Sequence, residues 1–129
     1  MGWVNFQLQN TPKIACRPKQ LHQIMINLVM NAIQAMGGNG EITLQARVTT
    51  QNQCEFVIRD TGPGVPLAIR ESIFEPFFTT KPAGQGTGLG LAIVYELIGQ
   101  NEAEIHLDSP PQGMMGAIFR MVFDFEQID

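Results

Sequence analysis

The sequence predicts an α/β fold of the α+β kind, in which helices cover one face of a β-sheet. Apolar residues recur at helical spacing over residues 19–36, whereas apolar and polar residues alternate over 41–48 and 54–58. Such alternation makes one face of the sheet apolar and the other polar, so we expect helices on the apolar face only. The 129 residues suffice for one core, and we expect 1–129 to form a single domain.

The first half of the chain supplies a strand, a helix and a hairpin. Val4, Phe6 and Leu8 alternate with polar residues and predict a strand, and a short second strand is expected over residues 13–16. The helical stripe over 19–36 stops at the glycines of residues 37–40. In the hairpin that follows, one face is apolar and is formed by Ile42, Leu44, Ala46, Val48, Cys54, Phe56 and Ile58.

The second half begins with a long irregular stretch over residues 61–90, which is typical of a lid or binding loop. A short helix is expected within it near residues 67–72. A helix over residues 89–98 should end at Gly99. A strand is expected at Ile105 and Leu107, and a final strand over residues 117–125.

Composition and charge exclude several classes of protein. The net charge of −4 and the pI of about 5.0 leave no basic surface for nucleic acid. No apolar stretch approaches the roughly 20 residues that span a bilayer, and two cysteines make no disulfide framework. We therefore expect a cytoplasmic domain with no direct membrane contact. A chain of this length is also compatible with a fragment of a longer protein.

Asp60 stands where an apolar strand meets a glycine turn, Asp60-Thr61-Gly62-Pro63-Gly64. It follows Cys54, Phe56 and Ile58 at every second position of the strand, which is the side that faces the core. Its carboxylate should therefore point toward the face that the helices cover. A buried carboxylate needs hydrogen-bond donors, and the exocyclic amine of adenine is a suitable one. Gly62 and Gly64 would let the backbone approach a flat ligand closely. The alternative is an Asp that caps an ordinary turn.

A glycine-rich run, residues 84–90, leads directly into the second helix. Free N–H groups and the positive end of the helix dipole suit phosphates there. No Lys-Ser or Lys-Thr follows, so the run is not a P-loop, and no strand leads into it as in a dinucleotide fold. Lys81 is the nearest cation and a candidate phosphate contact. The alternative is a flexible linker.

Asn27 and Asn31 lie one turn apart on the polar edge of the first helix. Their amide oxygens can reach a common target, and Mg²⁺ accepts a neutral oxygen ligand beside phosphate oxygens and water. The alternative is a solvated helix edge.

The aromatic segment, residues 74–81, lies beside the glycine run and indicates a plug over the core, a hinge for a lid, or a surface that docks a partner. His22 and His106 have no catalytic acid partner, although Glu104 shares a face with His106, and we interpret both as structural.

Four motifs in this order resemble the C-terminal ATP-binding domain of sensor histidine kinases of two-component systems, over residues 5–125. Residues 27–32 resemble the asparagine box of that family and residues 60–64 the first glycine box. Residues 73–81 resemble the phenylalanine box and residues 86–91 the second glycine box. The sequence of residues 74–81 is most similar to that of the nitrogen-regulation sensor branch.

The resemblance implies a two-layer sandwich with a mixed, mostly antiparallel sheet, the Bergerat fold of DNA gyrase, Hsp90 and MutL. It implies that Asp60 accepts the adenine amine, with Gly62 and Gly64 beside it, that Asn31 is the Mg²⁺ ligand, and that Asn27 lies near the phosphates. The remaining nucleotide contacts that it implies fall in the lid and the phosphate cradle: Phe78, Thr80, Lys81, Gly86, Thr87, Gly88, Leu89 and Gly90.

The resemblance also implies an activity, namely transfer of the γ-phosphoryl of Mg-ATP to a His on a separate helical dimerisation domain, with ADP as product and relay to a response regulator. Asn27 stands where ATP-hydrolysing relatives carry a Glu, so hydrolysis should be poor. The phosphoacceptor motif is missing here, Gln34 replaces a Lys of some relatives, and Ala117 replaces a small hydroxyl residue.

Other functions remain open at this point. The first is a GHKL-type Ser kinase, the second a gyrase-like ATPase, and the third a regulatory module that senses nucleotide without catalysis. The isolated domain should be a monomer, because dimerisation belongs to the other domain of that family.

Overall fold

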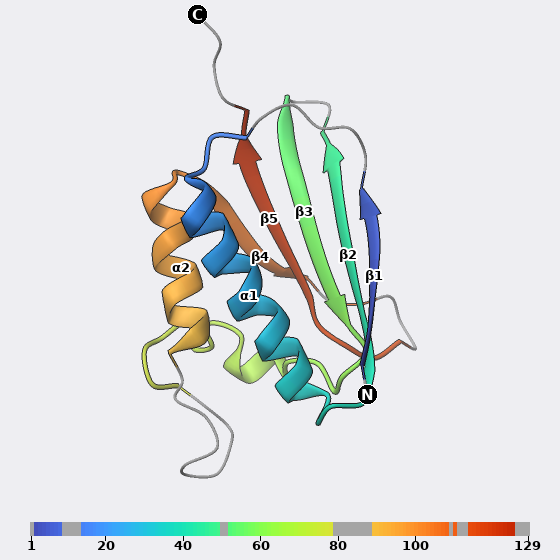
Figure 1. Cartoon of the computed structure of the whole chain (residues 1–129). Helices are drawn as coiled ribbons and strands as arrows, with labels where there is room; N and C mark the ends of the chain where they lie inside the picture. The colour runs from blue at the N-terminus through green and yellow to red at the C-terminus, as the bar shows by residue number, and fades with distance from the viewer. Residues whose placement is uncertain are drawn as a thin grey trace, which may run out of the picture.

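A computed structural model of the chain describes residues 2–8, 14–49, 52–78, 89–108, 110 and 114–125, with the backbone alone for 2–8. The described elements form two layers, a sheet and a pair of helices on one of its faces (Figure 1). Along the chain they are β1 (Gly2–Leu8), α1 (Pro18–Ala35), β2 (Gly40–Val48), β3 (Gln53–Asp60), the 3₁₀ turn η1 (Leu67–Ile69), α2 (Gly90–Gln100), β4 (Glu104–Asp108) and β5 (Ile118–Asp124).

The sheet has five strands in the order β1-β2-β3-β5-β4. β1 pairs with β2 in parallel, and the other three pairings are antiparallel. This confirms the mixed, mostly antiparallel sheet that the resemblance implies. The β2–β3 ladder ends where Ile42 faces Asp60, so Asp60 is the last paired residue of its strand.

The two helices run antiparallel across the same face of the sheet (Figure 1). The start of α1 is tied to the end of α2, because Asn101 Nδ2 donates to Gln20 Oε1 at 2.7 Å and Gln20 Nε2 donates to Gln100 Oε1 at 3.3 Å. Consequently the end of α1 and the beginning of α2 lie together at the other end of the molecule, where β3 also ends.

The core lies between the helices and the sheet, as the alternation predicts. From α1 it takes Ile24, Leu28 and Ala32 and from α2 Val94 and Ile98, which meet the apolar face of the strands. The most buried side chains of that face include Ile42, Ile58, Met121 and Phe123. Burial of these side chains removes apolar surface from water and is the main force holding the two layers together.

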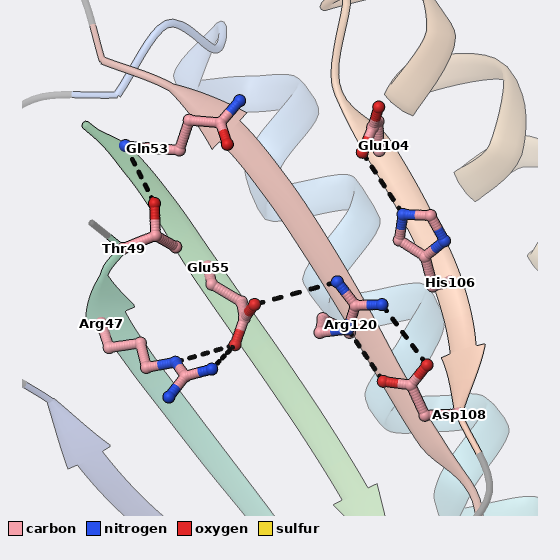
Figure 2. Close-up of polar contacts among 8 residues, drawn as sticks. All are labelled: Arg47, Thr49, Gln53, Glu55, Glu104, His106, Asp108 and Arg120. Atoms are coloured by element: carbon pink, nitrogen blue, oxygen red, sulfur yellow. Dashed lines mark hydrogen bonds and ion pairs between the residues drawn. The ribbon is translucent and has the colours of Figure 1, made fainter. Parts of the chain in front are cut away.

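The helix-free face of the sheet carries a ladder of alternating charges across four strands (Figure 2). Arg47 Nη2 lies 2.8 Å from Glu55 Oε1, Arg120 Nη1 lies 3.9 Å from Glu55 Oε2, and Arg120 Nε lies 2.8 Å from Asp108 Oδ2. The hydrogen bond to Asp108 raises the pKa of the Arg120 guanidinium. Glu55 is only 6% exposed on this face, because the two arginines cover it.

Several local predictions differ from the structure. Over residues 14–16 there is a single bridge, Ile14 to Phe125, in place of a strand. The short helix shrinks to one 3₁₀ turn, and α2 continues through Gly99 to Gln100. The sequence predicts an end at Gly99, but the residue that caps the helix is Asn101. The side-chain oxygen of Asn101 accepts the N–H of Arg17, and its Nδ2 donates to the carbonyl oxygen of Leu97. Val48 was expected in the core but is 40% exposed at the end of β2.

Candidate functional site

Asp60 is buried, 3% exposed, at the end of β3, as its parity predicts. Its Oδ1 accepts the N–H of Gly62 at 2.9 Å and the N–H of Ala117 at 3.2 Å. No hydrogen bond from a described residue reaches Oδ2. The carboxylate is therefore held by one oxygen and can accept a donor from a ligand with the other.

The turn after Asp60 is packed too closely for side chains. Gly64 has φ +81°, and a Cβ there would lie 2.9 Å from the carbonyl oxygen of Gly116. A Cβ at Gly62 would lie 3.1 Å from Asp60 Oδ1. Gly116, with φ +121°, lies so close to the carbonyl oxygen of Asp60 that any Cβ would overlap it. These glycines keep β5 and the turn together around the carboxylate.

Sequence reasoning missed Gly116. It lies between two exposed methionines and the last strand, and a single glycine in such a place predicts no particular structure. The only available signal was its place one residue before Ala117, at the start of the last strand. The close approach that requires glycine there is a tertiary contact between β3 and β5.

The end of α1 packs against the same turn. A Cβ at Gly62 would lie 3.2 Å from Met36 Cγ and 3.6 Å from the carbonyl carbon of Ala35. Asn27 and Asn31 lie earlier on α1 and are both half-buried. Asn27 Nδ2 is buried with no hydrogen-bond partner within the described ranges. A buried, unpaired amide donor is costly, and an anion oxygen beside α1 would satisfy it.

The residues present fit a magnesium ion only together with a phosphate ligand. Across the described parts of the chain, no cluster of three or more His, Cys, Asp or Glu side chains is arranged for a metal. The Asn31 amide offers one neutral oxygen. Mg²⁺ is usually held by few protein ligands and completed by substrate phosphates and water, so this sparse donor set is suitable for it.

The beginning of α2 lies at the same end of the molecule as the end of α1 (Figure 1). Leu89 precedes α2, and its carbonyl accepts the N–H of Ile93 at 2.9 Å, while a Cβ at Gly90 would meet nothing within 4 Å. The first N–H groups of an α-helix have no partner within the helix, so the start of α2 is able to offer N–H donors to a ligand at this end of the molecule. Thr80, Lys81, Gly86, Thr87 and Gly88 lie outside the described residues.

The described part of the aromatic segment, residues 74–78, packs onto α2 and the sheet. The Phe74 ring lies 5.2 Å from the ring of Tyr95 and 6.3 Å from that of Phe119. Phe78 is half-buried, whereas Phe77 is 73% exposed and has φ +66°. Beside them an open groove of about 440 Å³ runs over the first turns of α2 and has mostly apolar walls. Phe74 thus contributes to the core, and the groove leaves an apolar surface next to the start of α2.

Neither histidine joins this site. His106 Nε2 lies 3.3 Å from Glu104 Oε2 on the opposite, helix-free face (Figure 2). His22 is exposed on α1. The prediction that Glu104 and His106 share a face is confirmed.

Residues 16–127 match the family model of the histidine kinase-, DNA gyrase B-, and HSP90-like ATPases, so the chain belongs to this family. Among relatives, the signal transduction histidine-protein kinase AtoS of Escherichia coli K12 is 37% identical over 102 residues, which cover 79% of this chain and 16% of AtoS.

Solved structures agree with this assignment. The catalytic domain of histidine kinase ThkA superposes with a TM-score of 0.79 at 30% identity, covering 95% of this chain and 78% of that one. Full-length ShkA in complex with AMPPNP superposes with a TM-score of 0.81 at 28% identity, covering 98% of this chain and 27% of ShkA. The chain is thus an ATP-binding catalytic domain of the sensor histidine kinase type.

The chain spans 11–22% of the length of the first curated relatives that it matches. Those relatives are accordingly longer proteins, and the region that matches this chain is only one part of each. Of the helices that the structure describes, none is both long and apolar enough to cross a membrane.

Proposed function

We propose that this domain binds Mg-ATP and transfers the γ-phosphoryl group to a His on a separate helical dimerisation domain, for relay to a response regulator. Asp60 accepts the exocyclic amine of adenine through Oδ2, because its Oδ1 is already held by two backbone N–H groups. This held carboxylate with one oxygen available is the observation that supports the proposal most directly.

The phosphates extend from Asp60 toward α1 and the start of α2. Asn31 supplies an oxygen to Mg²⁺, and the unpaired Nδ2 of Asn27 donates to a phosphate oxygen. The bound Mg²⁺ neutralises phosphate charge. In the transfer, the bond from the γ-phosphorus to its bridging oxygen breaks as a bond to an imidazole nitrogen forms, and ADP leaves.

The phosphoacceptor comes from another domain, because neither histidine here lies near the site. The apolar groove over the first turns of α2 offers a helix of that domain a surface beside the phosphates. Asn27 carries an amide where a hydrolase needs a base, and an amide does not accept a proton from water at neutral pH. Transfer to a protein side chain is therefore favoured over hydrolysis, which argues against a gyrase-like ATPase.

The test uses this chain together with the helical domain of its parent protein. With ATP labelled at the γ-phosphate and Mg²⁺, we expect label on the helical domain in acid-labile, base-stable form, as phosphohistidine is. Calorimetric titration with ADP and AMPPNP, with and without Mg²⁺, measures binding separately. Nucleotide binding without transfer would favour the sensing module, and acid-stable label would favour a Ser kinase.

A further inference from the structure

Thr61 follows Asp60 and joins three segments of the chain. Its Oγ1 accepts the N–H of Glu41 at 3.0 Å and donates to Met36 Sδ at 3.6 Å. Glu41 is the second residue of β2, Met36 directly follows α1, and Thr61 directly follows β3. One hydroxyl therefore connects the turn after Asp60 both to the start of β2 and to the end of α1.

The hydroxyl takes over where the backbone ladder stops. Ile42 and Asp60 form the last register pair of β2 and β3, and the N–H of Glu41 is then paired with the Thr61 side chain. The side chains of Met36 and Thr61 close over Gly40, because a Cβ there would overlap Met36 Sδ and would lie 2.8 Å from Thr61 Oγ1. Thr61 and Met36 therefore meet over Gly40, between the turn and the end of α1.

α1 also carries Asn31, five residues before Met36. A helix rises about 1.5 Å per residue and is stiff over this length, so the position of Met36 sets that of Asn31 to within the helix geometry. Asp60 and Asn31 are proposed to bind opposite ends of one Mg-nucleotide. The distance between them matters only to a ligand that contacts both.

We propose that Thr61 is a positioning residue, which sets the distance between the adenine end of the site at Asp60 and the metal end at Asn31. This inference rests on the proposed function. Thr61 itself contacts neither end of the nucleotide. Its hydroxyl holds the turn against α1, so its loss should weaken binding of Mg-ADP more than binding of ADP alone.

Thr61→Val tests this with little change of shape. The isosteric substitution removes both the acceptor for Glu41 and the donor to Met36, and the side chain is exposed, so the fold should tolerate it. The affinity of ADP is measured by calorimetry in EDTA and in Mg²⁺. We expect Mg-ADP binding to weaken by about fivefold, as for one lost hydrogen bond, and binding in EDTA to change by less than about twofold.

Thr61→Ser is the matched control, because it keeps the hydroxyl and should restore the wild-type enhancement by Mg²⁺. Met36→Leu removes only the sulfur acceptor and should lower the enhancement by Mg²⁺ below that of the wild type, though by less than Thr61→Val does. This second variant keeps the question answerable if the valine variant does not fold.

Unfolding temperatures without ligand separate positioning from stability. If Thr61→Val or Met36→Leu lowers the unfolding temperature but leaves the Mg²⁺ enhancement as in the wild type, Thr61 serves stability alone and the inference is wrong. If the wild-type domain binds ADP in neither condition, the proposed function itself fails, and the inference with it. These outcomes are distinguished by the wild-type titration.

Discussion

Asp60 and Ala117 hold each other through two hydrogen bonds of opposite direction. The N–H of Asp60 donates to the carbonyl oxygen of Ala117 at 3.0 Å, and the N–H of Ala117 donates to Asp60 Oδ1 at 3.2 Å. The first bond continues the β3–β5 pairing, and the second orients the carboxylate. Ala117, which replaces the small hydroxyl residue of the family, thus contributes through its backbone.

Asp60→Asn should weaken ADP binding at least about tenfold. The charged oxygen that accepts the adenine amine becomes an NH2 group, so two hydrogen-bond donors then face each other. The new amide oxygen can still accept from Gly62 and Ala117, so the fold should survive. Titrations with ADP and GDP check this: the amide can donate to the guanine O6, so the preference for ADP should fall. Unchanged ADP affinity would exclude Asp60 as the adenine contact.

Asn31→Ala should abolish the strengthening of ADP binding by Mg²⁺ while leaving binding in EDTA nearly intact. The expected loss in Mg²⁺ is at least about tenfold, the usual effect of disturbing a metal's ligand shell. Gln23→Ala, at an exposed position of the same helix, is the control and should bind as the wild type does. A variant that retains the full Mg²⁺ effect would show that the ion has another ligand.

Gly116→Ala should destabilise the domain by about 3 kcal/mol or more, because the new Cβ overlaps the Asp60 carbonyl oxygen and φ is +121°. Urea unfolding measures the free energy of unfolding. Gly99→Ala is the opposite case, since that site in α2 has open space around it. It should stabilise the domain by up to about 1 kcal/mol. Equal effects of the two substitutions would contradict the tight fit of β5 against the turn.

Glu55→Gln should cost about 1–3 kcal/mol of unfolding free energy, because the Glu55 side chain is 8% exposed and lies between Arg47 and Arg120. Glu104→Gln is the control: that side chain is 69% exposed beside His106, and its loss should stay within about 0.5 kcal/mol. If both variants unfold at the same urea concentration, the charge ladder contributes no more than an exposed pair.

Cys54 should resist thiol reagents until the domain unfolds. It is fully buried, and burial, followed by the charge of Glu55, raises the pKa of its thiol above that of a free cysteine. The folded state thus binds this proton more tightly than the unfolded chain. The contribution of Cys54 to folding stability is complete below the pKa of the thiol in the unfolded chain and is lost as the pH rises through its higher pKa in the folded state.

Labelling with a disulfide reagent at pH 8 checks this prediction, and Cys16→Ser isolates the buried thiol. We expect the labelling rate of Cys54 to follow global unfolding and to rise with urea as unfolding does. Rapid labelling in native buffer would mean that the sheet opens locally at β3.

By itself, the sequence determined the elements whose patterns are long and regular. The stripe of α1 and the alternation of β2 and β3 each bury one face, and that requirement acts on every second or third residue, so the period is visible without a structure. The parity of Asp60 followed from the same alternation. The order of the four motifs was likewise sufficient for the family to be recognised.

Only the tertiary structure decided how these pieces meet. The parallel pairing of β1 with β2, the burial of Glu55 under two arginines and the requirement for glycine at position 116 depend on segments far apart in the chain. The same holds for the two bonds of Thr61 and for the two N–H groups that hold Asp60 by one oxygen. Such contacts follow from packing in three dimensions, and no local period or propensity encodes them.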